Sequence, residues 1–277
     1  MSDHASAAPG TAAPPAVSFL TRHHFLLRRL HSLSGIVPIG LFVIVHLFTN
    51  SQIFFSANGP GGADHFQHEV DFIHSMPALL WVEIALWSAI AFHAALGVVY
   101  MVVGTESPVK NVANYPYWSA RRYMLQRITA WIALIFIFLH VATLRWRWDL
   151  FGWFTPFYWR GEDVPGLDHK LAEVPLTTPL TAYALQKSWL IVAFYLVGVS
   201  AAIYHWCNGL WTAAISWGIT ITKTAQKRWG QVCLGLGAAL TVFMLVALVG
   251  TLKYDLEKDT TDEQKEVLKF VLPGWGK

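Results

Sequence analysis

Residues Phe25–His46 read FLLRRLHSLSGIVPIGLFVIVH, a basic pair followed by a long run without charge. The run extends from Leu30 to Ala63 without any Asp, Glu, Lys or Arg. A bilayer core of about 30 Å requires roughly 20 apolar residues in a helix that rises about 1.5 Å per residue. The stretch therefore predicts a membrane-spanning helix, which we place at about Leu33–Ile53.

Four further segments have the same apolar character, at about Leu79–Val103, Tyr123–Leu144, Trp189–Gly209 and Gln231–Leu252. The 277 residues are 55% hydrophobic and 13% charged, whereas about a quarter of the residues in a soluble domain are charged. We therefore expect an all-α integral membrane protein that forms a five-helix transmembrane bundle. The formal net charge of +3, with scattered basic residues, argues against a nucleic-acid-binding protein.

The flanking segments suggest the domain boundaries and the orientation. We divide the chain into a disordered cytoplasmic leader (1–24), the membrane domain (25–252) and a polar C-terminal tail (253–277), with a short amphipathic helix at about Asp262–Val271. Basic residues cluster before the first span and in the second and fourth connections, as is typical of cytoplasmic loops. We expect a multi-pass protein of the cell's inner (cytoplasmic) membrane, with its N-terminus in the cytoplasm and its C-terminus outside.

Each of the first four predicted helices contains one histidine, and the fifth contains none. They are His46, His93, His140 and His205. Counted from the cytoplasmic ends, His93 and His205 lie roughly 16 to 18 Å deep, and His46 and His140 roughly 25 to 27 Å deep. Two layers with two histidines each suit two stacked b-type haems, because each iron takes two axial imidazoles. One intramembrane histidine alone would suit a packing role equally well, so the argument depends on all four.

Other residues near these histidines fit haem binding, although each also has a simpler role. Gly97 and Gly209 lie one turn beyond a histidine and would let a haem approach the backbone, yet close helix packing also uses glycine. Haem propionates or an inner quinone need polar partners near the cytoplasmic side. The candidates are Arg28, Arg29, His31, Ser32, Gln126 and Arg127, for which contact with lipid headgroups is the simpler interpretation.

His74 and Glu83 are the candidates for an outer quinone and proton site. Reduction of a quinone consumes two protons, and histidine titrates near neutral pH. Glu83 lies in an otherwise uncharged run, so its carboxyl group is expected to pair with a cation or to stay protonated. An inner location for the quinone remains an open alternative.

Several segments together carry a family resemblance. They are Phe25–His46, FHAALGVVY (Phe92–Tyr100), LQRITAW (Leu125–Trp131), FLHVATLRW (Phe138–Trp146) and YHWCNGLWTAAISWGITIT (Tyr204–Thr222). In order and spacing the chain resembles the single-chain, two-haem cytochrome b anchor of succinate:quinone oxidoreductases (complex II), from about Phe25 to Lys223. The resemblance implies that His93 and His205 bind the haem nearer the cytoplasm. It implies that His46 and His140 bind the outer haem.

The resemblance also implies partners and a function. A flavoprotein and an iron–sulfur protein would dock on the cytoplasmic face, and electrons would pass through two haem b groups to a membrane quinone, with menaquinone favoured over ubiquinone. The intramembrane Glu that some fumarate-reducing relatives place just ahead of the fourth-helix histidine is absent, since Ile203 and Tyr204 occupy that region. Whether the complex forms a homo-oligomer stays open. Two alternative functions also stay open: a cytochrome b subunit of another quinone-linked dehydrogenase or hydrogenase, and a transporter with a histidine relay.

Overall fold

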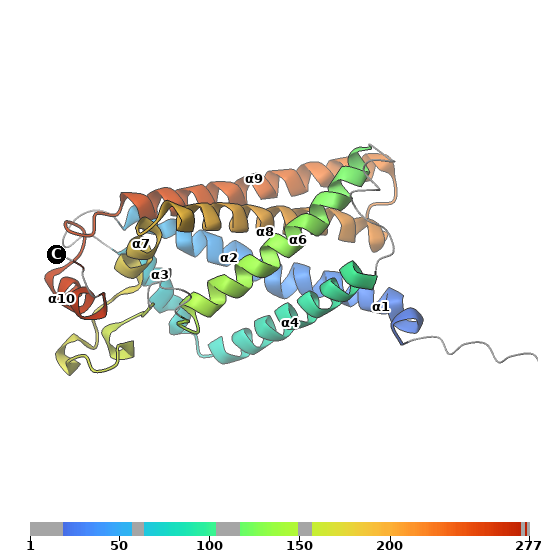
Figure 1. The fold of residues 1–277 in the computed structure, drawn as a ribbon. Coiled ribbons are helices and arrows are strands. Elements are labelled where there is room, and N and C mark those ends of the chain that lie inside the picture. Colours follow the sequence, from blue (N-terminus) through green and yellow to red (C-terminus); the bar gives the residue numbers. More distant parts are fainter. Residues whose placement is uncertain (1–18, 57–63, 104–116, 149–156, 273–274, 276–277) are drawn as a thin grey trace, which may run out of the picture.

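Five long apolar helices cross the molecule from end to end in the computed structural model, which describes residues 19–56, 64–103, 117–148, 157–272 and 275 (Figure 1). The first crossing combines α1 (Phe19–Ser34), η1 (Gly35–Ile39), α2 (Gly40–Ser51) and η2 (Gln52–Phe55). The others are α4 (Leu79–Val103), α6 (Trp118–Leu144), α8 (Trp189–Ser216) and α9 (Lys223–Lys253). Each is long and apolar enough to span a bilayer, and the expected five-helix membrane fold is confirmed.

Most of these helices extend beyond the uncharged cores from which we predicted them. α9 begins at Lys223 rather than near Gln231, and α1 begins at Phe19, inside the segment that we assigned to the leader. The rest of that leader, 1–18, lies outside the described residues. Lys and Arg can keep their charged ends in the headgroup region while their backbone stays helical, so a charged residue does not mark the end of a helix.

A wide turn interrupts the first crossing. Gly35–Ile39 form a π-helical turn that contains Pro38. Proline has no N–H to donate and its ring crowds the preceding turn, and a π-helical turn accommodates such a disruption inside a longer helix. The π-helical turn joins α1 to α2, and both this turn and α1 contact α4.

The bundle is most closely packed around α8. α6 and α9 both run along α8, and α9 also runs along α2. A side chain at Gly198 of α8 would overlap the ring of Phe136 on α6, so glycine allows this close approach. α4 packs mainly on α1 and η1 and is the least buried of the five spans.

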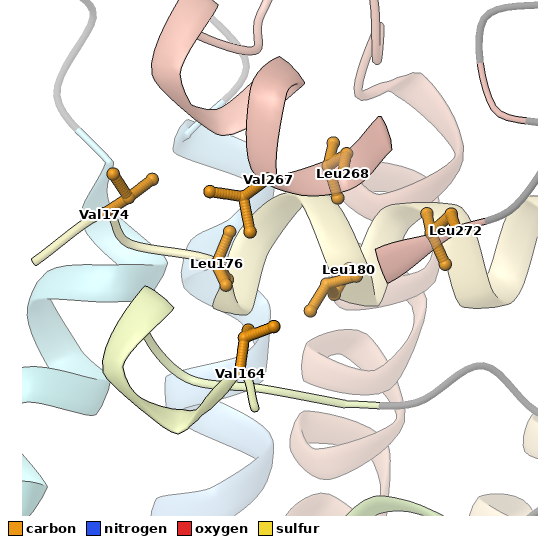
Figure 2. Close-up of a cluster of buried hydrophobic side chains, with 7 residues drawn as sticks. All are labelled: Val164, Val174, Leu176, Leu180, Val267, Leu268 and Leu272. Atoms are coloured by element: carbon orange, nitrogen blue, oxygen red, sulfur yellow. The ribbon is translucent and has the colours of Figure 1, made fainter. Parts of the chain in front are cut away.

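Three segments that are distant in the sequence form a cap at one end of the bundle (Figure 1). They are α3 (His65–His74), residues 157–186 with η3 (Gly161–Asp163), η4 (His169–Leu171) and α7 (Thr177–Gln186), and residues 254–272 with α10 (Asp262–Val271). The apolar core of the cap consists of Val164, Val174, Leu176, Leu180, Val267, Leu268 and Leu272 (Figure 2). α10 has the bounds that the sequence predicts, and its apolar face is buried against the long connection.

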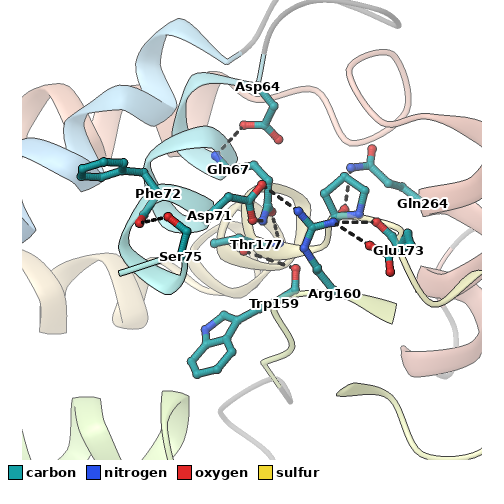
Figure 3. Close-up of polar contacts among 11 residues, drawn as sticks. Asp64, Gln67, Asp71, Phe72, Ser75, Trp159, Arg160, Glu173, Thr177 and Gln264 are labelled. Carbon is teal, nitrogen blue, oxygen red and sulfur yellow. Dashed lines mark hydrogen bonds and ion pairs between the residues drawn. The ribbon is translucent and has the colours of Figure 1, made fainter. Parts of the chain in front are cut away.

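Polar contacts also tie the cap segments together (Figure 3). The guanidinium of Arg160 lies 2.8 Å from a carboxylate oxygen of Asp71 on α3 and 3.6 Å from one of Glu173. The amide nitrogen of Gln264 on α10 donates a hydrogen bond of 2.7 Å to the backbone oxygen of Pro175. Residues 254–272 of the predicted polar tail therefore belong to a folded unit.

Leu268→Ala tests the packing of this cap. Leu268 is fully buried, and removing a buried leucine side chain costs about 2 to 5 kcal/mol of stability. Hydrogen–deuterium exchange should speed up in 157–186 and 254–272, while the five long helices keep their protection. Leu245→Ala, at a largely exposed position of α9, is the matched control. Unchanged exchange in the cap of the Leu268→Ala variant would contradict this packing.

Candidate functional site

The four histidines of the membrane helices form two pairs. The ring centroids of His93 (α4) and His205 (α8) lie 6.1 Å apart, and those of His46 (α2) and His140 (α6) lie 5.9 Å apart. Two imidazole nitrogens on opposite sides of one metal ion, at about 2 Å each, place the ring centroids about 6 Å apart. Both pairs thus have the spacing of two axial ligands, and each pair joins two helices.

The two pairs lie at different levels of the bundle. His93 and His205 are in the halves of α4 and α8 that lie toward the end of the bundle where α1 begins, opposite the cap. We call this end the N-terminal end of the bundle. His46 and His140 are in the halves of their helices that lie toward the cap. This order agrees with the two depths that we calculated from the sequence.

In three of the four imidazoles, Nδ1 contacts an oxygen atom of a neighbouring helix. Nδ1 of His93 lies 2.8 Å from the backbone oxygen of His31, and Nδ1 of His205 lies 3.2 Å from the backbone oxygen of Gln126. Nδ1 of His140 lies 3.2 Å from the hydroxyl oxygen of Tyr195. With the proton on Nδ1, the rings of His93 and His140 donate there and keep the lone pair of Nε2 for a metal ion. The same tautomer of His205 donates to the backbone oxygen of Gln126, whose amide nitrogen also lies 3.2 Å from Nδ1. His46 is held differently: the ring of Phe42 stacks on its imidazole, with ring centroids 5.0 Å apart.

Gly35 makes room for the ring of His93. A β-carbon at Gly35 would lie 2.5 Å from Cε1 of His93. The ring of His31 also stacks on that of His93, with ring centroids 3.9 Å apart and the two planes at 11°. The sequence analysis selected Gly97 and Gly209 instead, and a β-carbon at those positions would make ordinary contacts of 3.4 Å with His31 and 3.5 Å with Gln126.

A chain of polar side chains holds His205 from the neighbouring helix. The amide nitrogen of Gln126 donates to the backbone oxygen of His205 (3.1 Å), and its amide oxygen accepts from Asn208 (2.7 Å). Asn208 in turn accepts a hydrogen bond of 2.7 Å from Nε of Arg122, whose guanidinium lies over the ring of Trp211. Gln126 was a sequence candidate. Asn208 and Arg122 were not, and they are identified only by the contact of Asn208 with Gln126 and that of Arg122 with Asn208.

Buried polar atoms gather at the N-terminal end near His93. Among the described residues, Nε of Arg29, Nδ1 of His31 and the hydroxyl of Tyr100 are buried without a hydrogen-bond partner. The rings of His31 and Tyr100 lie 5.6 Å apart, and the guanidinium of Arg28 lies 5.9 Å from the Tyr100 ring. Buried polar atoms without partners are rare in folded proteins, so the neighbouring His31 and Tyr100 fit a polar or anionic ligand. The guanidinium of Arg29 lies against Phe25 and Trp217 instead.

The other two inner candidates have partners within the protein. The hydroxyl of Ser32 accepts a hydrogen bond of 2.9 Å from the indole nitrogen of Trp217. The guanidinium of Arg127 donates to the hydroxyl of Tyr123 and to the backbone oxygen of Met101, both at 2.8 Å. Arg127 thus caps the end of α4 without any acidic partner in the described part of the chain.

At the cap end, the structure brings His74 and Glu83 into one cluster. The carboxylate of Glu83 pairs with Arg145 at 3.4 Å, as we expected of an intramembrane carboxyl group. The guanidinium of Arg145 lies 5.2 Å from the ring of Trp159, and the ring centroids of Trp159 and His74 lie 4.1 Å apart with their planes at 74°. Burial, reinforced by the charge of Arg145, lowers the pKa of His74 below its ordinary value, so its imidazole is neutral at pH 7.

These features define a class of protein, an all-α, multi-pass membrane protein with two histidine pairs held between four of its helices. No protein-family model matches the chain. The succinate dehydrogenase cytochrome b558 subunit of Bacillus subtilis (strain 168) is 31% identical over 227 residues, which cover 82% of this chain and 93% of that protein.

The chain therefore belongs to the family of succinate dehydrogenase cytochrome b subunits. The resemblance drawn from the sequence is confirmed, and with it the role of a membrane-anchor cytochrome b. Both the transporter and the cytochrome b of an unrelated complex are thereby set aside.

Gly35→Ala tests the fit around His93. The added methyl group forces the His93 ring to move, although its Nδ1 is tied to the backbone of His31, and such overpacking costs about 1 to 3 kcal/mol. With one haem b at each histidine pair, as proposed below, the haem b absorbance per chain should fall toward half. Gly235→Ala, where a β-carbon would meet nothing within 4 Å, should leave it unchanged. Equal absorbance in the two variants would contradict the fit.

Proposed function

We propose that the chain binds two haem b groups, one between His93 and His205 and one between His46 and His140. The observation that carries this proposal is the pairing of four histidines from four helices at 6.1 and 5.9 Å. A haem held by both imidazoles of a pair would supply one-electron transfer. The name of the similar protein, a cytochrome b558, supports haem b as the cofactor.

The polar residues at the N-terminal end would hold the propionates of the nearer haem. Arg28, Arg29 and His31 supply positive charge or hydrogen-bond donors there, and Tyr100 adds a buried hydroxyl without a partner. Gln126 has a different role in this proposal, because its amide already binds His205 and Asn208. Gln126 orients His205, the proposed iron ligand.

We further propose that the chain connects an iron–sulfur subunit with a membrane quinone, as the name of the similar protein suggests. Basic residues gather at the end of the bundle opposite the cap: Arg22, Arg28, Arg29, Arg121, Arg122, Lys223, Lys227 and Arg228. The positive-inside rule places such an end in the cytoplasm. The iron–sulfur subunit and the flavoprotein would then dock at this end of a protein of the inner membrane, with the cap outside.

The cluster of His74, Glu83, Arg145 and Trp159 is our proposed quinone site. Glu83 can take up a proton and pass it to a quinone oxygen, after which Arg145 again pairs with the carboxylate. Trp159 offers an aromatic face beside the neutral imidazole of His74. Menaquinone stays the favoured quinone. The unpartnered hydroxyl of Tyr100 and Nδ1 of His31 make the N-terminal end the second candidate location.

Histidine variants test the haem assignment. His93→Ala or His205→Ala should each remove one haem b, and His46→Ala or His140→Ala should each remove the other. Each variant takes away one of the two histidine ligands that hold the haem iron. Haem content per chain and reduced-minus-oxidised spectra of the purified complex provide the measurement. His68→Ala, on the exposed face of α3, is the control. If losing His46 and losing His93 removed the same haem, the pairing would be wrong.

Glu83→Gln tests the quinone site separately. The variant keeps the size of the side chain but cannot release a proton, and positioned acid–base groups contribute about 10² to 10⁴ in rate. Succinate:quinone reductase activity should fall by about 10²-fold or more, while haem content and haem reduction by succinate persist. Glu162→Gln, at an exposed residue of the cap, should keep full activity. Full activity in Glu83→Gln would move the quinone site elsewhere and leave the haem assignment intact.

A further inference from the structure

Arg122 is a partly buried cation that lies between three of the membrane helices. It belongs to α6, and its guanidinium carbon lies 3.6 Å from the ring centroid of Trp211 on α8. On the side of α9, a β-carbon at Gly230 would lie 3.9 Å from its Nη1. Its sequence neighbour Arg121 is exposed instead. The two adjacent arginines therefore have different surroundings, and only Arg122 lies inside the bundle.

The position of the Arg122 guanidinium is fixed from two directions. Its Nε donates a hydrogen bond of 2.7 Å to the side-chain oxygen of Asn208. The indole on which it lies is itself held by α9, because the indole nitrogen of Trp211 donates to the backbone oxygen of Gln226 at 3.0 Å. Arginine at a membrane surface commonly extends its charged end into the headgroup region. In Arg122 the hydrogen bond and the aromatic face hold the charge inside the protein.

The helices around Arg122 carry no acid that offsets its charge. No Asp or Glu occurs between Glu106 and Asp149, or between Glu173 and Asp255. The helices α6, α8 and α9 therefore contain none. Solvent and salt screen a partly buried charge much less than an exposed one. The positive charge of Arg122 consequently acts on groups in its neighbourhood more strongly than that of an exposed arginine.

A short chain of hydrogen bonds connects Arg122 with His205. Asn208 donates to the amide oxygen of Gln126 at 2.7 Å, and the amide nitrogen of Gln126 donates to the backbone oxygen of His205 at 3.1 Å. Nδ1 of His205 lies 3.2 Å from that amide nitrogen and 3.2 Å from the backbone oxygen of Gln126. Arg122 and Gln126 are four residues apart and share one face of α6. The cation thus lies about one helical turn from the residue that contacts the imidazole.

We propose that Arg122 is a positioning residue for His205, and that its charge raises the reduction potential of the haem held by His93 and His205. Reduction of a haem adds one negative charge, so a nearby cation without an acidic partner on its helices favours the reduced form. Hydrogen bonds that orient a metal ligand also tune the metal. The inference rests on the proposed haem assignment and adds a role that this assignment does not require.

A redox titration of the haem absorbance of the purified complex tests this inference. Arg122→Gln removes the charge and keeps a hydrogen-bond donor. The equilibrium constant for reducing one haem should fall about tenfold, which is about 59 mV for a one-electron couple, and that of the other haem by less than about twofold. The same shift should appear in a His46→Ala background, which is expected to keep only the haem of His93 and His205.

Two further variants separate the charge of Arg122 from its size and packing. Arg122→Lys keeps the charge without the planar guanidinium, and the equilibrium constant should change by less than about threefold. Asn208→Asp keeps the arginine but places a carboxylate against it, so the potential of the same haem should fall. This variant keeps the inference testable if Arg122→Gln does not retain the haem.

Arg121→Gln is the matched control, because it removes the same charge from the exposed neighbouring residue. It should change either equilibrium constant by less than about twofold. Equal shifts in Arg121→Gln and Arg122→Gln would show an effect of diffuse surface charge and would overturn the inference. Unchanged potentials in Asn208→Asp, together with unchanged potentials or haem loss in Arg122→Gln, would also overturn it. A single haem in the unmodified complex would contradict the haem assignment itself, and the haem content of the same samples distinguishes the two failures.

Discussion

A polar side chain inside a bilayer needs a partner, and this requirement determines how three of the four histidines lie. Three of them place Nδ1 against an oxygen of a neighbouring helix: α4 against α1, α8 against α6, and α6 against α8. The same contacts hold the helices together and point the second ring nitrogen away from the oxygen. Helix packing and the geometry of the proposed ligands therefore depend on the same hydrogen bonds, and Gly35 matters because it lets one of them form.

The two ends of the bundle differ in a way that suits the proposed function. The end that carries α1 is basic and contains buried donors without partners, which suits propionates and an anionic lipid surface. The other end is covered by a cap with its own apolar core and ion pairs. Arg145 and Trp159 link the cap side to Glu83 and His74. Because the cap has its own apolar core and polar contacts, it can hold Trp159 in place beside an intramembrane carboxylate.

Much of this architecture could be predicted from local sequence. The five spans follow from uncharged runs, α10 follows from its amphipathic pattern, and one histidine on each of four helices is visible without a structure. The depth of each histidine follows from the helical rise, because position along a straight helix depends only on residue number. For that reason the two levels could be calculated, while the rotation of each helix about its axis could not.

The features that the sequence did not reveal all depend on contacts between distant segments. Asn208 and Arg122 look like ordinary residues of a helix until Gln126 is seen between Asn208 and His205. Gly35 is one glycine among 20, and only the position of the His93 ring identifies it. The cap joins residues about 100 positions apart, as in the hydrogen bond between Gln67 and Thr177, and no local pattern predicts such pairing.

The central claim is that two imidazole pairs each hold one iron. It is tested most directly by measuring the haem b content of the purified protein together with the low-temperature electron paramagnetic resonance spectrum of its oxidised form. The two histidine pairs predict two haems per chain, both low-spin. Their interplanar angles of 86° and 76° predict the strongly anisotropic signals that nearly perpendicular imidazole ligands produce. One haem per chain, or a high-spin signal from an iron with an open axial position, would contradict the account.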